Sequence, residues 1–160
     1  MNNNKFNFFV PLQKGEEAKG SNYLMKIKGV ASSKSVDSDG ETLDPSGFDF
    51  SDFLKTGMIN WNHNSTRSST AICGKPTAAR VINSGKDFYV EGVLFNNAEG
   101  RAVADLIKVL ANEPDRQLGW SIEGQAIERH PMYPKRITKA RISGIALTHC
   151  PKNKTPLLKS

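Results

Sequence analysis

The chain has 160 residues, which is enough for one domain around a single core. With 38% hydrophobic residues and a mean hydropathy of −0.47, we expect a soluble, globular protein, and no run approaches the roughly 18 apolar residues of a membrane span. The formal charge is +6, and its whole excess lies in residues 129–160, which carry eight Lys or Arg and no Asp or Glu.

Residues 1–21 are polar, punctuated by glycine and without the apolar core of a secretory signal. We predict a loose N-terminal arm there, with residues 6–10 able to dock, followed by a single domain over residues 22–160. Alternating apolar and polar residues predict a strand over residues 23–32. Residues 34–47 are rich in Asp, Ser, Gly and Pro and therefore predict a loop.

A short helix is predicted over residues 46–57, from a serine start to a glycine end. The apolar residues 58–62 then lead into a long polar loop. Residues 78–95 predict a hairpin that turns at Ser84 and Gly85.

The strongest helical pattern lies over residues 96–114, where apolar residues keep a 3.6-residue period. Two more strands are predicted over residues 118–128 and 137–148, with a turn between them, and residues 149–160 are irregular. About six or seven strands with one strong helix and no βαβ rhythm predict a mainly β, α+β fold. We expect a small barrel or rolled sheet with helices packed outside it.

Neither the cysteines nor the acidic residues form a metal-binding pattern. Cys73 and Cys150 lie far apart and match no ligand spacing, so they fit a reducing compartment and leave one disulfide open. The acidic residues of the 34–47 loop resemble a calcium loop in their Asp-x-Asp-Gly order, but the closing Glu at the required spacing is absent. We therefore favour a turn, and expect no metal and no cofactor.

The strand over residues 118–128 carries polar side chains that invite a chemical interpretation. Trp120 falls on the apolar face, and Ser121 and Glu123 fall on the other. A serine becomes a nucleophile when a histidine reaches it in space and takes its proton, while an N–H group or a cation stabilises the oxyanion. The Gly-x-Ser-x-x-Gly order continues as a strand and is not the nucleophile elbow of an α/β-hydrolase.

Three histidines are candidates for such a base. His63 follows the apolar residues 58–62, His130 lies in the turn between the last two strands, and His149 lies at the end of the last strand. Each is also accounted for as a surface or structural histidine, and the residues alone do not choose among them.

The basic end over residues 129–160 is typical either of contact with nucleic acid or an acidic protein, or of a solvated sheet edge protected by lysines. Tyr133 is the one aromatic residue among its basic residues, whereas proteins that bind single strands use several. We therefore favour the sheet edge over a nucleic-acid contact.

Several segments together resemble the tailed-phage prohead (capsid maturation) proteases, a family related in fold to herpesvirus assemblins. They are "KGVASSKSVDSDGETLDPSGFDFSDFLKTGMINWNH", "AEGRAVADLIKVL", "LGWSIEG" and "ARISGIALTHCPKNKT", and they cover roughly residues 23–155. Each segment is short, but their order and spacing match the family. The resemblance implies a small assemblin-like β-barrel surrounded by a few helices, and a serine endopeptidase without a cofactor.

By motif, the resemblance implies His63 of "WNH" as the general base and Ser121 of "GWSIEG" as the nucleophile. The family's third catalytic residue falls at Gly144, which cannot orient an imidazole. Glu123, about 6–7 Å along the strand from Ser121 on the same face, is one replacement. His149 is another if a bulge turns it inward, and a Ser121–His63 dyad oriented by water or a backbone carbonyl is a third.

The resemblance further implies scaffolding and major capsid proteins as substrates, self-cleavage, a homodimer, and a location in the host cytoplasm inside the immature capsid. A basic loop containing Lys152 and Lys154 would stabilise the oxyanion. The alternative is a catalytically inactive assembly or scaffolding protein on the same fold, which Gly144 and the basic end favour. A distance of about 3–4 Å between the side chains of Ser121 and His63 would favour the enzyme.

Overall fold

The computed structural model describes residues 5–11, 13–17, 22–34, 40–64 and 71–149, and every strand of that part belongs to one sheet. The strands are β1 (Lys5–Pro11), β2 (Gln13–Glu17), β3 (Tyr23–Ser33), β4 (Thr42–Leu43), β5 (Phe48–Asp49), β6 (Ile59–Trp61), β7 (Ile72–Ile82), β8 (Asp87–Phe95), β9 (Gly119–Arg129) and β10 (Arg136–Thr148). Their order across the sheet is β1-β9-β10-β6-β7-β8-β3-β2. The short strands β4, β5 and β6 pair with β10 in parallel, whereas the other pairs are antiparallel.

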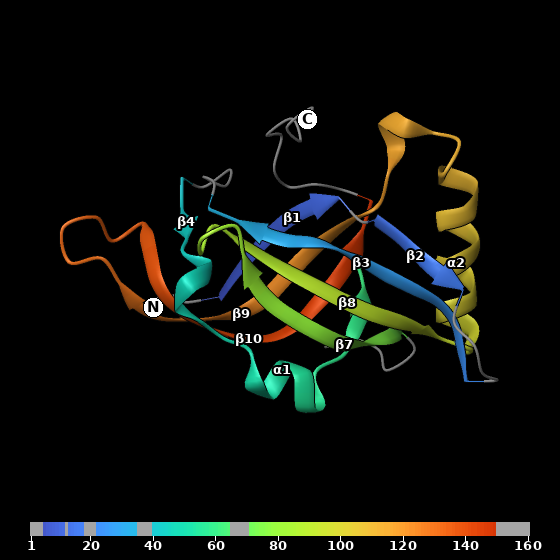
Figure 1. Ribbon diagram of the computed structural model, residues 1–160, viewed down its shortest axis with the longest axis horizontal. Helices are drawn as coiled ribbons and strands as arrows, with labels where there is room; N and C mark the ends of the chain where they lie inside the picture. Colours follow the sequence, from blue (N-terminus) through green and yellow to red (C-terminus); the bar gives the residue numbers. More distant parts are fainter. Residues whose placement is uncertain (1–4, 12, 18–21, 35–39, 65–70, 150–160) are drawn as a thin grey trace.

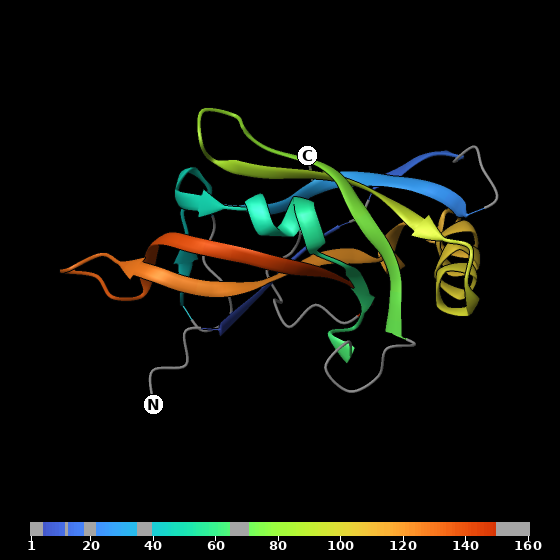
Figure 2. The ribbon, with the colours of Figure 1, turned by 90° about the horizontal axis from the view of Figure 1, so that it is seen from below.

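The sheet curls into a half-barrel (Figures 1 and 2), and β1 and β9 come to lie against β3 across the curl. Helix α1 (Ser51–Thr56) packs on β7 and β10, and helix α2 (Ala98–Leu110) packs on β3, β7 and β8. Two 3-10 turns, Pro45–Gly47 and Pro114–Arg116, complete the elements. The predicted α+β class is confirmed. No helix in the described ranges is long and apolar enough to cross a membrane.

The core is built from side chains on the apolar faces of the strands and helices. Its largest fully buried members include Trp120, Phe53 and Phe88. Burying a side chain of this size stabilises the fold by about 1.5–3 kcal/mol. In β9, Trp120, Ile122 and Ala126 are buried, so the face assigned to them from the sequence is correct.

The helix predicted over residues 46–57 is divided in the structure, and that prediction is corrected. The Asp44 carboxylate accepts hydrogen bonds from the backbone N–H and the hydroxyl of Ser46, which closes a 3-10 turn instead of opening an α-helix. The chain then extends as β5, and Asp49 accepts the same pair of bonds from Ser51, where α1 begins. The predicted end at Gly57 is confirmed.

The N-terminal segment also differs from the loose arm expected over residues 1–21. β1 pairs with β9 from Lys5 to Pro11, and β2 pairs with β3. An edge strand leaves backbone N–H and C=O groups unpaired, and an extended neighbouring segment satisfies them. The domain division at residue 22 stays a prediction.

The remaining elements follow the sequence closely. The hairpin forms from β7 and β8, although β7 already begins at Ile72, inside the expected polar loop. Its turn places Ser84 and Gly85 at φ values of 56° and 84°, a left-handed conformation that glycine adopts without strain. The strong helical pattern becomes α2, whose first turn is capped by the Asn97 side chain.

Candidate active site

Ser121 is the third residue of β9, which is paired with a strand on each side. Its neighbours in register are Phe9 of β1 and Ala146 of β10. The residue is only 4% exposed. Because its strand is paired on both sides, the backbone that carries the hydroxyl is held in place. Such a serine has little freedom to move away from a partner that reaches it.

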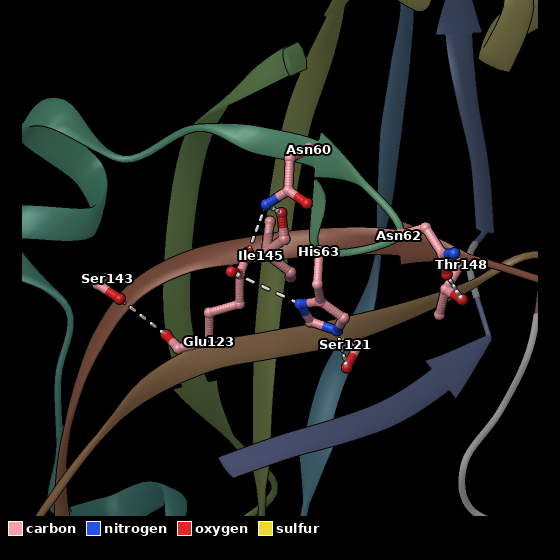
Figure 3. A network of polar contacts seen from close by, with 8 residues as sticks. All are labelled: Asn60, Asn62, His63, Ser121, Glu123, Ser143, Ile145 and Thr148. Atoms are coloured by element: carbon pink, nitrogen blue, oxygen red, sulfur yellow. Dashed lines mark hydrogen bonds and ion pairs between the residues drawn. The ribbon is translucent and has the colours of Figure 1, made fainter. Parts of the chain in front are cut away.

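His63 is placed by an unusual turn directly after β6. Asn62 and His63 have φ values of 55° and 60°, in the left-handed region that Asn and His adopt more readily than most residues. The Asn62 N–H donates to Leu147 O at 2.8 Å, and the Thr148 hydroxyl donates to Asn62 Oδ1 at 2.8 Å. Both anchors are on β10, so the last strand fixes the turn that directs the imidazole back over β9 (Figure 3).

The imidazole of His63 meets the serine hydroxyl directly. His63 Nε2 lies 2.8 Å from Ser121 Oγ, within the range in which a base can take a hydroxyl proton. In the tautomer with its proton on Nδ1, the free Nε2 accepts that hydroxyl. The sequence criterion of about 3–4 Å for an enzyme is therefore met.

Glu123 lies on the opposite side of the imidazole from Ser121 (Figure 3). Its Oε2 is 3.5 Å from His63 Nδ1, which is an ion-pair distance and longer than a well-formed hydrogen bond. The Nδ1 atom is buried and has no hydrogen-bond partner in the described part of the chain. Glu123 is thus the carboxylate that faces the second ring nitrogen, and such contacts often tighten when substrate binds.

The position of Gly144 accounts for the space that Glu123 occupies. Gly144 is the register partner of Glu123, next to a bulge between Ile142 and Gly144. A Cβ added at residue 144 would lie 3.3 Å from Glu123 Oε1 and 3.6 Å from Met58 O. By the resemblance, the third catalytic residue would stand at this position, where the chain has Gly144. In the structure, the Glu123 carboxylate extends over Gly144 from the neighbouring strand.

A second small residue of β10 lies between the two sides of the site. Ala146 pairs with Asn60 of β6 on one side and with Ser121 of β9 on the other, and it is fully buried. Side chains in register on neighbouring strands share a face of the sheet. Gly144 and Ala146 therefore add little side-chain bulk on this face of β10. Side chains of the β6 segment can reach those of β9 across it.

The other histidines do not join this cluster. His149 is exposed and stacks on Trp61, with ring centroids 5.8 Å apart. His130 accepts hydrogen bonds at Nδ1 from the N–H groups of Met132 and Tyr133, and so has a structural role in the β9–β10 turn. Lys152 and Lys154 lie outside the described residues.

Neither the Cys73 thiol nor the acidic residues of the described ranges offer an alternative site chemistry. Burial raises the pKa of the Cys73 thiol to about 12, so it remains protonated at neutral pH. Within the described ranges, no group of three His, Cys, Asp or Glu side chains could hold a metal ion. Two acidic residues of the predicted loop are instead paired with cations, Asp44 with Lys34 and Glu41 with Arg129.

Sequence reasoning missed three polar residues that support the site: Asn60, Asn62 and Thr148. Asn60 and Thr148 are 2% and 4% exposed, and Asn62 anchors the His63 turn. The signal available was an asparagine inside a short apolar strand, since Asn is depleted in strands and costs free energy when buried.

Comparison with solved structures finds the same fold in the capsid assembly protease of bacteriophage T4. The TM-score is 0.60 over 93% of this chain and 100% of that one, at 14% sequence identity. No protein family and no curated protein matches the sequence. At this identity the likeness concerns the fold alone.

Proposed function

We propose that this chain is a serine endopeptidase that cleaves capsid or scaffolding proteins during the assembly of a phage capsid. The observation that carries the proposal is the contact of 2.8 Å between His63 Nε2 and Ser121 Oγ, with the Glu123 carboxylate facing the other ring nitrogen, Nδ1. The fold shared with the T4 capsid assembly protease supports the choice of substrate class.

In the first half of the reaction, His63 takes the proton of the Ser121 hydroxyl as Oγ attacks the peptide carbonyl carbon. The tetrahedral intermediate then collapses, the C–N bond breaks, and His63 returns the proton to the departing amine. Glu123 faces Nδ1–H and stabilises the imidazolium that exists between these two transfers.

In the second half, water enters where the amine has left and gives a proton to His63 Nε2 as it attacks the acyl-enzyme ester. Collapse of the second intermediate breaks the ester C–O bond, returns the proton to Ser121 Oγ and releases the new carboxylate. Every proton passes through His63, and no further reactant is needed.

The partners follow from this function and are proposals too. Scaffolding and major capsid proteins would be the substrates, the chain itself would be cut as well, and the active form would be a homodimer inside the immature capsid in the host cytoplasm. The basic end would hold the enzyme on acidic assembly partners. Reversing the charges of Lys135, Arg136, Lys139 and Arg141 should reduce co-packaging of the enzyme into proheads, and unchanged packaging would contradict this role.

The inactive assembly protein remains the alternative. Gly144, which favoured it, is now weaker support, because the Glu123 carboxylate faces His63 from the neighbouring strand. The direct test mixes the wild-type protein, or its Ser121→Ala variant, with the neighbouring scaffold and capsid gene products and follows intact masses. Fragments with the wild type alone support the peptidase. Equal fragments with both proteins exclude Ser121 as the nucleophile, and fragments with neither favour the assembly protein.

A further inference from the structure

We propose that Asn60 is a positioning residue that holds the Glu123 carboxylate in the orientation required by His63. This inference rests on the proposed function. Asn60 Nδ2 donates a hydrogen bond to Glu123 Oε1, while the other oxygen, Oε2, faces His63 Nδ1 at 3.5 Å. The four side chains thus form one continuous chain of contacts from Asn60 through Glu123 and His63 to Ser121 (Figure 3).

The burial of Asn60 indicates a role beyond packing. The residue is 2% exposed in the three-residue strand β6, between the apolar Ile59 and Trp61. Its Oδ1 is buried without a hydrogen-bond partner in the described part of the chain. A buried, half-satisfied amide costs free energy that an apolar residue would avoid, so its presence calls for an explanation.

The amide supplies what Glu123 lacks on its own strand. Glu123 has a flexible side chain that is 24% exposed, so it could turn toward water. A hydrogen bond to one oxygen fixes the plane of the carboxylate. A weaker bond of 3.4 Å to Ile145 O ties the same amide to β10.

The two strands therefore divide the site between them. β6 and its following turn carry the positioning amide and the base, three residues apart, and β9 carries the nucleophile and the carboxylate, two residues apart. Within the described residues, Glu123 is the one ionisable group to which the Asn60 side chain is hydrogen-bonded. Changes at Asn60 should thus reach Ser121 only through Glu123 and His63.

The test measures how fast a fluorophosphonate probe labels Ser121 as pH is varied. Ser121 Oγ forms a bond to phosphorus, fluoride leaves, and His63 takes the hydroxyl proton, so the rate reports the base directly. Intact mass gives the labelled fraction of the wild type and of Asn60→Ala, Asn60→Asp and Asn83→Ala. Asn83→Ala is the matched control, because the Asn83 side chain bonds Asp87 in the turn between β7 and β8 and none of the four site residues.

We expect Asn60→Ala to lower the maximal labelling rate about 10–100-fold, because the carboxylate is no longer held against the ring. The rising limb of its pH profile should move to lower pH, since a released carboxylate stabilises the imidazolium less. Asn60→Asp places a carboxyl group against Glu123, and two carboxyl groups at this distance share one proton, so the pair keeps a single negative charge and the bond to Oε1. Its rate and midpoint should therefore stay close to those of the wild type. Asn83→Ala should keep the wild-type rate and midpoint.

A merely structural role would lower the labelling rates of both Asn60 variants alike, whereas the positioning role predicts a loss in Asn60→Ala alone. Wild-type labelling with unchanged rate and midpoint in both Asn60 variants would overturn the inference while leaving the peptidase intact. Failure of the wild type to label above Ser121→Ala would instead refute the proposed function. Should Asn60→Ala fail to fold, NMR titration of His63 in Ser121→Ala, with and without Asn60→Leu, decides: Leu keeps the shape of the side chain and removes its hydrogen bond, and an unchanged titration midpoint rejects the role.

Discussion

Replacing Glu123 by glutamine removes one charge and keeps the shape of the side chain. At 3.5 Å from His63 Nδ1, the carboxylate stabilises a full positive charge on the ring by about 5 kcal/mol at an effective dielectric of about 20, and by about 1 kcal/mol at that of water. Both side chains are 24% exposed, so the true value lies between these limits. These energies correspond to rate losses of roughly tenfold to 3,000-fold, and we expect about 100-fold.

The assay is fluorophosphonate labelling of Ser121 at neutral pH, followed by intact mass. Glu128→Gln is the matched control: Glu128 lies on the same strand, pairs with Lys139 at 3.3 Å and has no contact with the His63 cluster. Its labelling rate should equal that of the wild type. If Glu123→Gln also labels at the wild-type rate, Glu123 does not orient His63, and a dyad oriented by water or a backbone carbonyl becomes the better mechanism.

Three further predictions address the surroundings of the site. Gly144→Ala should slow labelling severalfold with little loss of stability, because a Cβ 3.3 Å from Glu123 Oε1 shifts the carboxylate by a few tenths of an ångström. Thr148→Val removes the bond to Asn62 Oδ1, so chemical denaturation should show a loss of about 1–2 kcal/mol, and labelling should slow as the His63 turn loosens. The Cys73 thiol has a pKa of about 12 in the folded protein and releases its proton more readily in the unfolded chain. Above pH about 9 the unfolded chain therefore binds fewer protons than the folded protein, and the free energy of unfolding should fall from there to about pH 12. Chemical denaturation of Cys73→Ala should show a less steep fall.

Periodicity in the sequence was sufficient for the elements that carry their own apolar face. The β9 alternation and the helical period of α2 both appear in the structure as predicted. The pairing of β1 with β9 could not be read in the same way, because it depends on backbone groups of an edge far along the chain. The division of the 46–57 helix depended on two local aspartate bonds that compete with helix formation.

At the site, motif order placed Ser121 and His63, and strand alternation placed Glu123 on the correct face. The structure brings all three together. The role of Gly144 was not accessible from the sequence, because it follows from a bulge that sets this glycine opposite Glu123. Asn60 was missed for a similar reason: its contact with Glu123 joins residues 63 positions apart.

The His63 turn has a consequence for when the site can exist during synthesis. His63 and Ser121 are 58 residues apart, and the Asn62 side chain is anchored by Thr148, 86 residues later. Contacts this distant in sequence form late, since the chain between them must first be ordered. In a nascent chain, Ser121 is therefore present before His63 is held against it, and the proposed activity should appear only after β10 has emerged and paired.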